Sequence, residues 1–219
     1  MDVSKFWDQL FREIDLMWGK EPAASAQYAL RLFKTHGIKK ILIPGMGYGR
    51  NAQLFYNNDF DITGIEISPH AIELARNTMQ LTFPVYCGSV NDMPFDNEQY
   101  EGIYCHALVH LLHPKERKKF INNCLHQLQP GGYLVFSIIS KASSLYGQGK
   151  FLSTDRYLLP NGVSVKFYDV DSAKKEFGAH GATEVFTMDE PITFKENELP
   201  LKMIMVKIKK PGVPGQNNV

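Results

Sequence analysis

Apolar positions along the chain recur with two different periods, and the change of period predicts alternating helices and strands. Two helical stretches come first, and the second begins after Pro22 and ends near Gly37. The first stretch is expected to bury one stripe, which is made of Phe6, Leu10, Ile14 and Met17. The chain therefore opens with two helices that precede any strand.

Short apolar runs separated by helical patterns follow. The predicted strands are 38–43, 61–67, 83–88, 100–106 and 133–139, with two more over 182–188 and 199–210. One intervening helix opens on Ser68 and Pro69, a capping residue followed by a residue that favours the first turn. Alternation at this spacing is typical of an α/β fold in which a parallel sheet lies between two helical layers.

A single domain is expected, because 219 residues supply one α/β core and too little chain for two. Within this domain, 1–219, the pattern divides the chain into consecutive parts. They are N-terminal helices that could form a lid (1–37), a core (38–139), an insertion (140–169), a C-terminal helix with strands (170–210) and a disordered tail (211–219).

Composition narrows the possible partners. The chain has 24 Lys plus Arg against 23 Asp plus Glu, a formal net charge of +1, so no global field would recruit nucleic acid or an anionic membrane. Its three cysteines, Cys87, Cys105 and Cys124, form no CxxC pair, which suits a reducing compartment. No stretch has the apolar length of a membrane span or of a signal sequence. We expect a cytoplasmic protein, monomeric or homodimeric, with a small-molecule ligand.

The stretch ILIPGMGYGRN (41–51) places three glycines at alternate positions directly after the first predicted strand. Glycine there permits a tight turn into a helix and lets a ligand approach the main chain. The dinucleotide fingerprint G-x-G-x-x-G fails, because Arg50 stands where its third glycine belongs, and no Lys-Ser/Thr pair follows Gly49 as a P-loop requires. A ligand loop of the form G-x-G-x-G and a merely tight turn both remain open.

Further features follow this loop in order. Glu66 ends the second predicted strand, where a carboxylate can accept hydrogen bonds from both hydroxyls of a ribose. The segments CGSVNDMPF (87–95), YEGIYCHALVHLL (100–112) and LQPGGYLVFSI (128–138) come next. In combination, over roughly 38 to 139, these motifs resemble class I S-adenosylmethionine-dependent methyltransferases of the small-molecule type.

The resemblance implies a three-layer, Rossmann-like, doubly wound sheet of seven strands, mostly parallel with the last one antiparallel. It implies S-adenosyl-L-methionine as the cofactor. It also implies a set of cofactor-binding residues, namely Gly45, Met46, Gly47, Gly49, Arg50, Asn51, Glu66, Ile67, Ser89, Val90 and His106.

Two positions depart from the family pattern. Ile43 stands where the family carries an acidic residue, so another group must hold the amino-acid end of the cofactor. Arg50 could face the carboxylate there, or could be an ordinary solvated residue, and Asn51 could cap the following helix.

The second departure is Ser89, which replaces the family's usual aspartate on the adenine side. We expect the backbone amide of Val90 to contribute most to adenine recognition. Asp92 or backbone carbonyls are alternatives for the adenine amino group.

Three histidines, His106, His110 and His113, follow one another at spacings of four and three. Such spacing can converge on zinc, but no Glu follows His106 as in H-E-x-x-H, and we predict no metal. The resemblance implies that His106, which ends the fourth predicted strand, lies beside the sulfonium of the cofactor. His110, one turn further, is a candidate general base, and a packed histidine that orients the loop is the alternative.

Acceptor choice is expected to reside outside the core, in the N-terminal helices and the 139–169 insertion. The stretch WGKEP (18–22) joins Trp18 to a possible hinge, in the style of the lids of small-molecule methyltransferases. The insertion predicts a hairpin around Pro160-Asn161-Gly162, with Ser164, Lys166 and Tyr168 alternating onto one face. That hairpin is either a solvated or oligomeric surface, or a pocket wall that presents Arg156, Lys166 and Tyr168.

The sequence thus predicts a methyltransferase that moves the methyl group of S-adenosylmethionine to an oxygen, nitrogen or sulfur of a small molecule. Alignment of the two reactants would supply most of the acceleration, up to roughly 7–11 kcal/mol. Two alternatives stay open. One is an aminopropyl transferase of the same fold, and the other is a non-enzymatic module that binds the cofactor.

Overall fold

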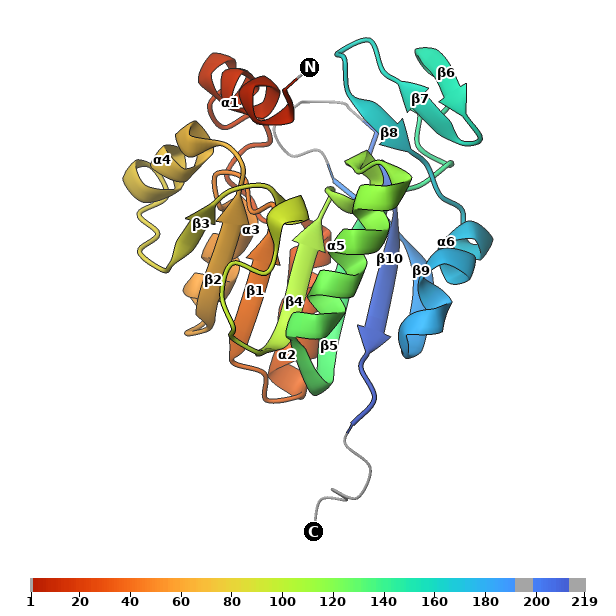
Figure 1. Cartoon of the computed structure of the whole chain (residues 1–219). Coiled ribbons are helices and arrows are strands. Elements are labelled where there is room, and N and C mark those ends of the chain that lie inside the picture. Colours follow the sequence, from red (N-terminus) through yellow and green to blue (C-terminus); the bar gives the residue numbers. More distant parts are fainter. Residues whose placement is uncertain (1, 192–198, 213–219) are drawn as a thin grey trace.

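The apolar runs predicted as strands assemble into one seven-stranded sheet in the computed structural model, which describes residues 2–191 and 199–212 (Figure 1). The strand order is β3-β2-β1-β4-β5-β10-β9. The strands are β1 (Lys40–Pro44), β2 (Asp61–Glu66), β3 (Val85–Cys87), β4 (Tyr100–His106), β5 (Leu128–Ile139), β9 (Ala182–Glu190) and β10 (Leu201–Lys209).

Strands β3, β2, β1, β4 and β5 run parallel, and β10 runs antiparallel to both β5 and β9. The predicted α/β fold, with seven mostly parallel strands and the last one antiparallel, is confirmed. The order reverses at β1, from which the chain moves first to β2 and later to β4, so the carboxyl ends of these three strands meet at one edge. That edge carries the glycine stretch, Glu66 and His106.

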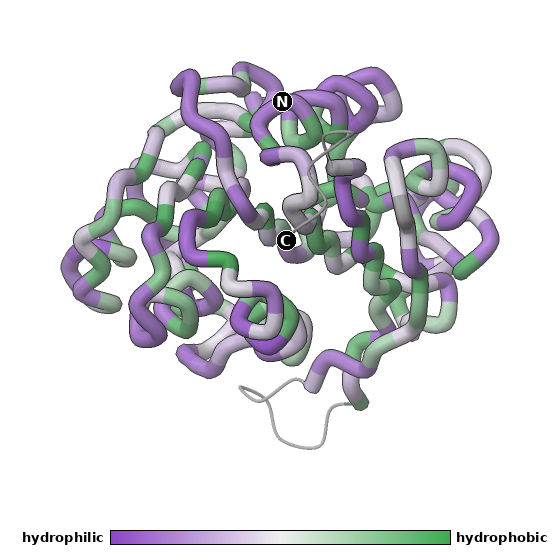
Figure 2. Tube along the Cα trace, turned by 90° about the horizontal axis from the view of Figure 1, so that it is seen from below, coloured by the Kyte–Doolittle hydropathy of each residue, from purple (hydrophilic) through white to green (hydrophobic). Residues whose placement is uncertain are grey.

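Helices cover both faces of the sheet (Figure 1). One face packs against α2 (Ala24–Thr35), α3 (Arg50–Tyr56) and α4 (Pro69–Asn77), and the other packs against α5 (Pro114–Gln127) and α6 (Val170–Phe177). Three 3-10 turns complete the helical elements, η1 (Val90–Asp92), η2 (Val109–Leu111) and η3 (Gly178–His180). Figure 2 shows hydrophobic segments between the layers and hydrophilic ones along many outer turns.

Helix α4 illustrates how local sequence sets these elements. The Ser68 side chain accepts a hydrogen bond from the Ala71 amide, and Pro69 supplies the first turn. The predicted start of this helix is therefore confirmed.

The first helix, α1 (Val3–Glu13), does not flank the sheet but lies at its carboxyl edge, above α4 (Figure 1). The predicted apolar stripe is wrong: the helix ends at Glu13 and Ile14 is 54% exposed, whereas Phe11 is 2% exposed. The buried face of α1 is the one that carries Phe11. Asp2 caps the N-terminus of the helix, where its side chain accepts from the amides of Ser4 and Lys5. Because α2 belongs to the core layers, only α1 and the segment up to residue 23 can act as a lid. We call residues 2–23 the N-terminal cap.

A three-stranded sheet forms a second cap at the same edge (Figure 1). It consists of β6 (Lys150–Ser153), β7 (Arg156–Leu158) and β8 (Ser164–Lys166), all antiparallel. The predicted hairpin around Asn161 is confirmed, with the added strand β6. We call residues 140–168 the β-cap. The predicted disordered tail lies outside the described residues from 213 onward.

Candidate functional site

The glycine stretch forms the turn between β1 and α3, and its backbone requires glycine. Gly45 has φ +65° and Gly49 has φ +85°, and Gly49 is the N-cap of α3. A Cβ on Gly49 would collide with the Leu81 side chain, and a Cβ on Gly45 would lie 2.8 Å from the Leu108 side chain. The loop is therefore held close against two neighbouring segments.

Hydrogen bonds tie this loop to the end of β2. The amides of Gly45 and Met46 donate to the carbonyl of Ile65 at 2.8 and 3.1 Å. The Gly47 amide donates to Oε2 of Glu66 at 2.8 Å. The Ile65 carbonyl and the Glu66 carboxylate, both at the end of β2, thus hold the glycine loop in place.

Glu66 is a buried acid at this edge, with 5% of its surface exposed. Its other carboxylate oxygen accepts from the amides of Ile67 and Ser68, at 2.9 and 3.0 Å. Burial raises the pKa of Glu66, and the hydrogen bonds from Ser68, Gly47 and Ile67 oppose that rise. A carboxylate has about four acceptor positions, so one remains for a ligand hydroxyl.

The segment after β3 forms η1 rather than an open loop. Ser89 caps it by accepting from the Asn91 amide at 3.2 Å, and Val90 is buried. Asp92, which the sequence analysis named as an alternative partner for the adenine amino group, is exposed.

Arg50 and Asn51 begin α3 and reach the N-terminal cap. Nη1 of Arg50 donates to the Glu21 carbonyl at 2.9 Å. Asn51 does not cap α3 as predicted, because Gly49 occupies the N-cap; its Oδ1 accepts from the Ala23 amide at 2.8 Å instead. Asn51 therefore connects α3 to the start of α2.

The two histidines after β4 have different surroundings. His106 is partly accessible, and its Nδ1 lies 2.9 Å from the Ser25 hydroxyl. His110 is 5% exposed, and its Nδ1 accepts from the Ile139 amide at 3.2 Å. Burial, with Arg156 and Arg117 nearby, lowers the pKa of His110 to about 3. The general-base interpretation of His110 is therefore wrong, because Nδ1 is occupied and neutral imidazole then carries its proton on Nε2. It anchors the chain between β4 and β5.

His113 caps α5 in a capping box with Glu116, whose side chain accepts from the His113 amide at 2.8 Å. Among the described residues, no group of three or more His, Cys, Asp or Glu side chains converges as a metal site would need. The three cysteines are unpaired, with Cys87 exposed and the other two buried.

Sequence patterns did not single out three further polar residues at this edge, Ser25, Tyr104 and Glu190. The carboxylate of Glu190, at the end of β9, accepts from the amides of Ala24 and Ser25 at 2.8 and 3.4 Å. It therefore caps α2, whose own N-cap, Ala23, has no capping side chain. Burial raises the pKa of Glu190 above its ordinary value, and these hydrogen bonds together with the charge of Arg50 partly oppose that rise.

The N-terminal cap is attached to the glycine loop by Tyr48. Its hydroxyl donates to the Gly19 carbonyl at 2.6 Å and accepts from the Trp18 amide at 3.1 Å. The Trp18 and Tyr48 rings stack at 6.1 Å, and Phe11 meets both rings edge-on. The cap thus rests on a residue between two of the loop glycines.

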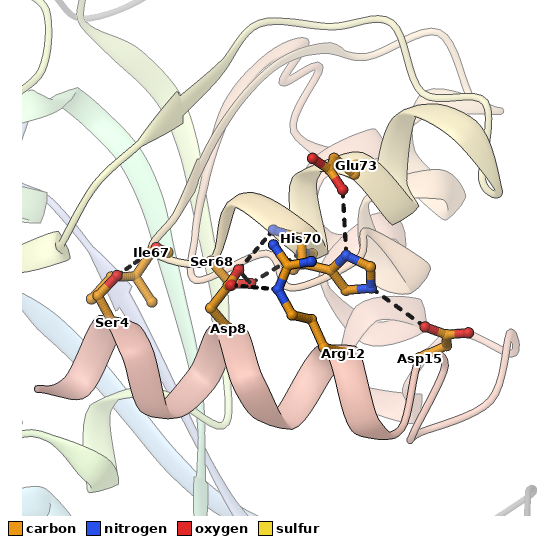
Figure 3. Close-up of polar contacts among 9 residues, drawn as sticks. Ser4, Asp8, Arg12, Asp15, Ile67, Ser68, His70 and Glu73 are labelled. Carbon is orange, nitrogen blue, oxygen red and sulfur yellow. Dashed lines mark hydrogen bonds and ion pairs between the residues drawn. The ribbon is translucent and has the colours of Figure 1, made fainter. Parts of the chain in front are cut away.

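A second set of contacts attaches α1 to the turn between β2 and α4 (Figure 3). Oδ1 of Asp8 accepts from the Ser68 hydroxyl and from the His70 amide, each at 2.9 Å. The Ser4 hydroxyl donates to the Ile67 carbonyl at 3.2 Å. Because Ile67 and Ser68 also donate to Glu66, the cap touches the segment that orients this carboxylate.

The β-cap side chains predicted to line a pocket are engaged elsewhere. Tyr168 is fully buried and its hydroxyl donates to Glu176, whereas Lys166 donates to the Thr154 carbonyl. The guanidinium of Arg156 donates to the carbonyls of Leu111 and Leu112, both at 2.9 Å. The pocket-wall interpretation is wrong because β8 ends at Lys166 and the chain then enters the core.

Comparisons with known proteins show what the core is similar to. Residues 41–132 match the methyltransferase domain family. The O-methyltransferase rstn1 of Aspergillus nomiae is 31% identical over 140 residues, 60% of each chain. The ubiquinone biosynthesis O-methyltransferase of Coxiella burnetii is 28% identical over 111 residues, which cover 49% of this chain and 47% of the relative. The chain thus spans about half to three fifths of the length of these curated relatives.

The fold also matches solved structures. One is the 1,6-didemethyltoxoflavin-N1-methyltransferase of Burkholderia thailandensis with bound 1,6-didemethyltoxoflavin and S-adenosylhomocysteine. It superposes with a TM-score of 0.69 at 16% identity, over 95% of this chain and 87% of the other. No helix in the described part of the chain has the length and apolar character needed to cross a membrane.

Proposed function

We propose that this chain, whose residues 41–132 match the methyltransferase domain family, is a class I methyltransferase that transfers the methyl group of S-adenosyl-L-methionine to an oxygen, nitrogen or sulfur atom of a small molecule. The observation that carries the proposal is the junction of β1 and β2, where the buried Glu66 carboxylate holds the Gly47 amide. With three amides already bound to Glu66, its one free acceptor position beside the glycine turn fits one hydroxyl of a ribose, rather than both hydroxyls as the sequence suggested.

The other residues named from the sequence supply a complementary set of groups. Gly45, Met46, Gly47 and Gly49 would contact the cofactor through their backbone, Ile67 would follow Glu66 along the ribose, and Ser89 and Val90 would face the adenine. Arg50 and His106 are the donors nearest to where the amino-acid end would lie. The donor set fits S-adenosylmethionine, which supplies an activated methyl group when it is bound.

The chain's own residues would act by alignment. Glu66 and the glycine loop fix the adenosine part, while the N-terminal cap covers the loop and the β-cap covers the ends of β4 and β5. A Cβ on Gly162 in the β-cap would lie 3.8 Å from the Phe6 ring of α1, so the two caps approach each other. Together they would exclude water and hold an acceptor in line with the methyl group.

Calorimetric titration with S-adenosylmethionine, S-adenosylhomocysteine and NAD tests the proposal. We expect the two sulfur ligands to bind and NAD not to bind, because Arg50 replaces the third dinucleotide glycine. Binding of NAD in the absence of both sulfur ligands would overturn the assignment.

The variant Glu66→Ala tests the residue that carries the proposal. It is expected to weaken S-adenosylhomocysteine binding by about 1.5–3 kcal/mol, the usual loss for a hydrogen bond to a charged group. Circular dichroism controls for folding, because the variant also leaves three amides without their acceptor. Unchanged affinity in a folded variant would remove Glu66 from the site.

The class of acceptor is tested by measuring the formation of S-adenosylhomocysteine in the presence of phenols, amines or thiols. Bulk tRNA is the nucleic-acid acceptor in the same assay. We propose a small-molecule acceptor, and turnover with tRNA alone would contradict it. Turnover with decarboxylated cofactor would favour the aminopropyl transferase, and binding without any turnover would favour the non-enzymatic module. We also propose a cytoplasmic location and a monomer or homodimer, which cell fractionation and size-exclusion chromatography with light scattering would check.

A further inference from the structure

A short chain of hydrogen bonds lies beneath the carboxyl end of β4, between the sheet and α2. The Ser25 hydroxyl oxygen lies 2.9 Å from the Tyr104 hydroxyl oxygen and 2.9 Å from Nδ1 of His106. Ser25 and Tyr104 are both 0% exposed, so water does not replace either bond. The proton positions in this chain can therefore be worked out from the available partners.

Tyr104 fixes the direction of the chain. Burial raises the pKa of its hydroxyl far above the ordinary tyrosine value, so the hydroxyl keeps its proton. Ser25 is its hydrogen-bond partner within the described residues, so Tyr104 donates to Ser25. The Ser25 hydroxyl also helps to lower the pKa of the nearby Glu190 carboxylate. Its close contact with an acceptor, however, is the one at 2.9 Å to Nδ1 of His106, so we assign the serine proton to that nitrogen. The opposite direction would leave the tyrosine O–H buried without an acceptor, which is unfavourable.

A neutral histidine whose Nδ1 accepts carries its proton on Nε2. Burial, followed by the charge of Arg50 and by His110, lowers the pKa of His106 to about 3, so the ring is neutral near pH 7. Over residues 2–191 and 199–212, Nε2 has no hydrogen-bond partner, and the ring is partly accessible at the sheet edge. His106 therefore offers an N–H group to a ligand and has no free lone pair with which to remove a proton.

Arg50, at the start of α3, adds a positive charge to the same edge of the sheet. Its charge contributes to the lowered pKa of His106, and its guanidinium is held by the Glu21 carbonyl. The neighbouring acid, Glu190, directs its carboxylate to the amides of Ala24 and Ser25. A neutral N–H donor together with the charge of a guanidinium is a combination that favours a carboxylate.

We propose that Tyr104 and Ser25 are positioning residues that hold His106 as an Nε2–H donor, and that His106 with Arg50 binds the carboxylate at the amino-acid end of the cofactor. This inference rests on the proposed function and extends it. It identifies which groups act where Ile43 stands in place of an acid, and it assigns His106 to binding rather than to removal of a proton from the acceptor.

The proton position is tested on the free protein. In protein labelled with ¹⁵N-histidine, long-range ¹H–¹⁵N correlation is expected to show His106 as the Nε2–H tautomer. The variant Tyr104→Phe removes the donor that fixes Ser25 and is expected to shift His106 toward a mixture of tautomers. Tyr100→Phe is the matched control, because Tyr100 is equally buried in β4 but donates to Asp96. An Nδ1–H tautomer in the unmodified protein would overturn the inference.

Ligand binding is tested with S-adenosylhomocysteine and with 5′-methylthioadenosine, which has the same adenosine part but no amino-acid end. His106→Phe is expected to weaken S-adenosylhomocysteine binding about 3- to 10-fold, the range for one hydrogen bond, and to leave methylthioadenosine binding unchanged. His106→Gln retains an N–H donor and is expected to recover most of the affinity.

The outcomes separate this inference from the proposed function. If neither ligand binds the unmodified protein, the proposed function fails, and the carboxylate site fails with it. If both ligands bind and His106→Phe weakens them equally, the proposed function stands and the carboxylate site is refuted. Loss confined to S-adenosylhomocysteine supports the site.

Discussion

The two caps at the carboxyl edge of the sheet are attached in different ways. The β-cap is joined to the body by buried contacts, in which Arg156 is 9% exposed and donates to carbonyls of η2. Lys141 also joins the β-cap to the start of α6, because its ammonium group pairs with Asp155 in the β-cap and with Asp169, the N-cap of α6, each at 2.8 Å. None of these groups belongs to the proposed cofactor site, so the β-cap is expected to keep its place whether or not a ligand is bound.

The N-terminal cap, in contrast, makes its polar contacts with the glycine loop and the turn after β2. Its partners are Tyr48, Arg50, Ile67 and Ser68, together with the His70 amide. Several of these residues are proposed to touch the cofactor or adjoin one that does. A segment that covers the site is coupled to a ligand when both contact the same loop. We therefore expect the N-terminal cap to respond to the cofactor and the β-cap to respond little.

The largest effect is expected from the buried anchor of the β-cap. Arg156→Met keeps a long side chain but leaves the Leu111 carbonyl without its donor, and we expect a loss of about 2–4 kcal/mol in the free energy of unfolding. Urea denaturation measures this loss. Lys150→Met, in the exposed strand β6, is the control and is expected to change stability by no more than about 0.5 kcal/mol. Equal stability of the two variants would show that the β-cap is not anchored through Arg156.

An intermediate effect is expected from deletion of residues 1–20. The deletion removes Phe11 and Trp18 from Tyr48, and the burial of one large aromatic side chain corresponds to about 1.5–3 kcal/mol. We expect a folded core with weaker cofactor affinity, since the truncated chain keeps α2 and the glycine loop. Denaturation and calorimetry measure the two quantities.

Hydrogen exchange in the full chain distinguishes a lid from a permanent part of the core. Exchange over residues 5–30 is expected to slow when S-adenosylhomocysteine is added, while exchange in the β-cap stays nearly constant. Protection of 5–30 that is the same with and without ligand, or unfolding of the truncated chain, would contradict the coupling.

The β1–β5 core shows what the sequence could predict. Hydrophobic periodicity predicted the strands of this core, because β1, β2, β4 and β5 contain apolar runs that are mostly buried on both faces. The glycine turn and Glu66 could be predicted for the same reason. Their positions at strand ends follow from local chain geometry.

The caps show why the rest could not. The buried face of α1 packs through Ser4, Asp8 and Phe11, and two of these are polar residues that an apolar pattern ignores. Glu190 caps a helix that lies 166 residues earlier in the chain, and such a pairing leaves no local signal. Tertiary contacts of this kind become visible only when distant segments are placed together.

The smallest effect is expected from Asp8→Asn, and its sign depends on pH. Burial raises the pKa of Asp8, but hydrogen bonds from the His70 amide, Arg12 and Ser68 outweigh it, so the pKa in the folded protein lies below the ordinary value of 3.8. The unfolded chain therefore binds this proton more readily, and the contribution of Asp8 to stability is present above pH 4, roughly, and is lost as the pH falls through the lowered value.

Because Asp8 is partly exposed, with 20% of its side-chain surface accessible, we expect Asp8→Asn to cost only about 0.5–1 kcal/mol near pH 7. The difference from the unmodified protein is expected to be smaller at roughly pH 3 than at pH 7, because the unmodified carboxyl also takes up a proton as the pH falls through its lowered pKa. Asp15→Asn is the matched control, since Asp15 reaches only the His70 ring, at 3.4 Å, and does not touch Ser68 or the His70 amide. Urea denaturation at both pH values measures the differences. If Asp15→Asn lowers stability as much as Asp8→Asn does, the attachment of α1 is a general charge effect; a loss specific to Asp8 that is smaller in acid ties the N-terminal cap to the turn that orients Glu66.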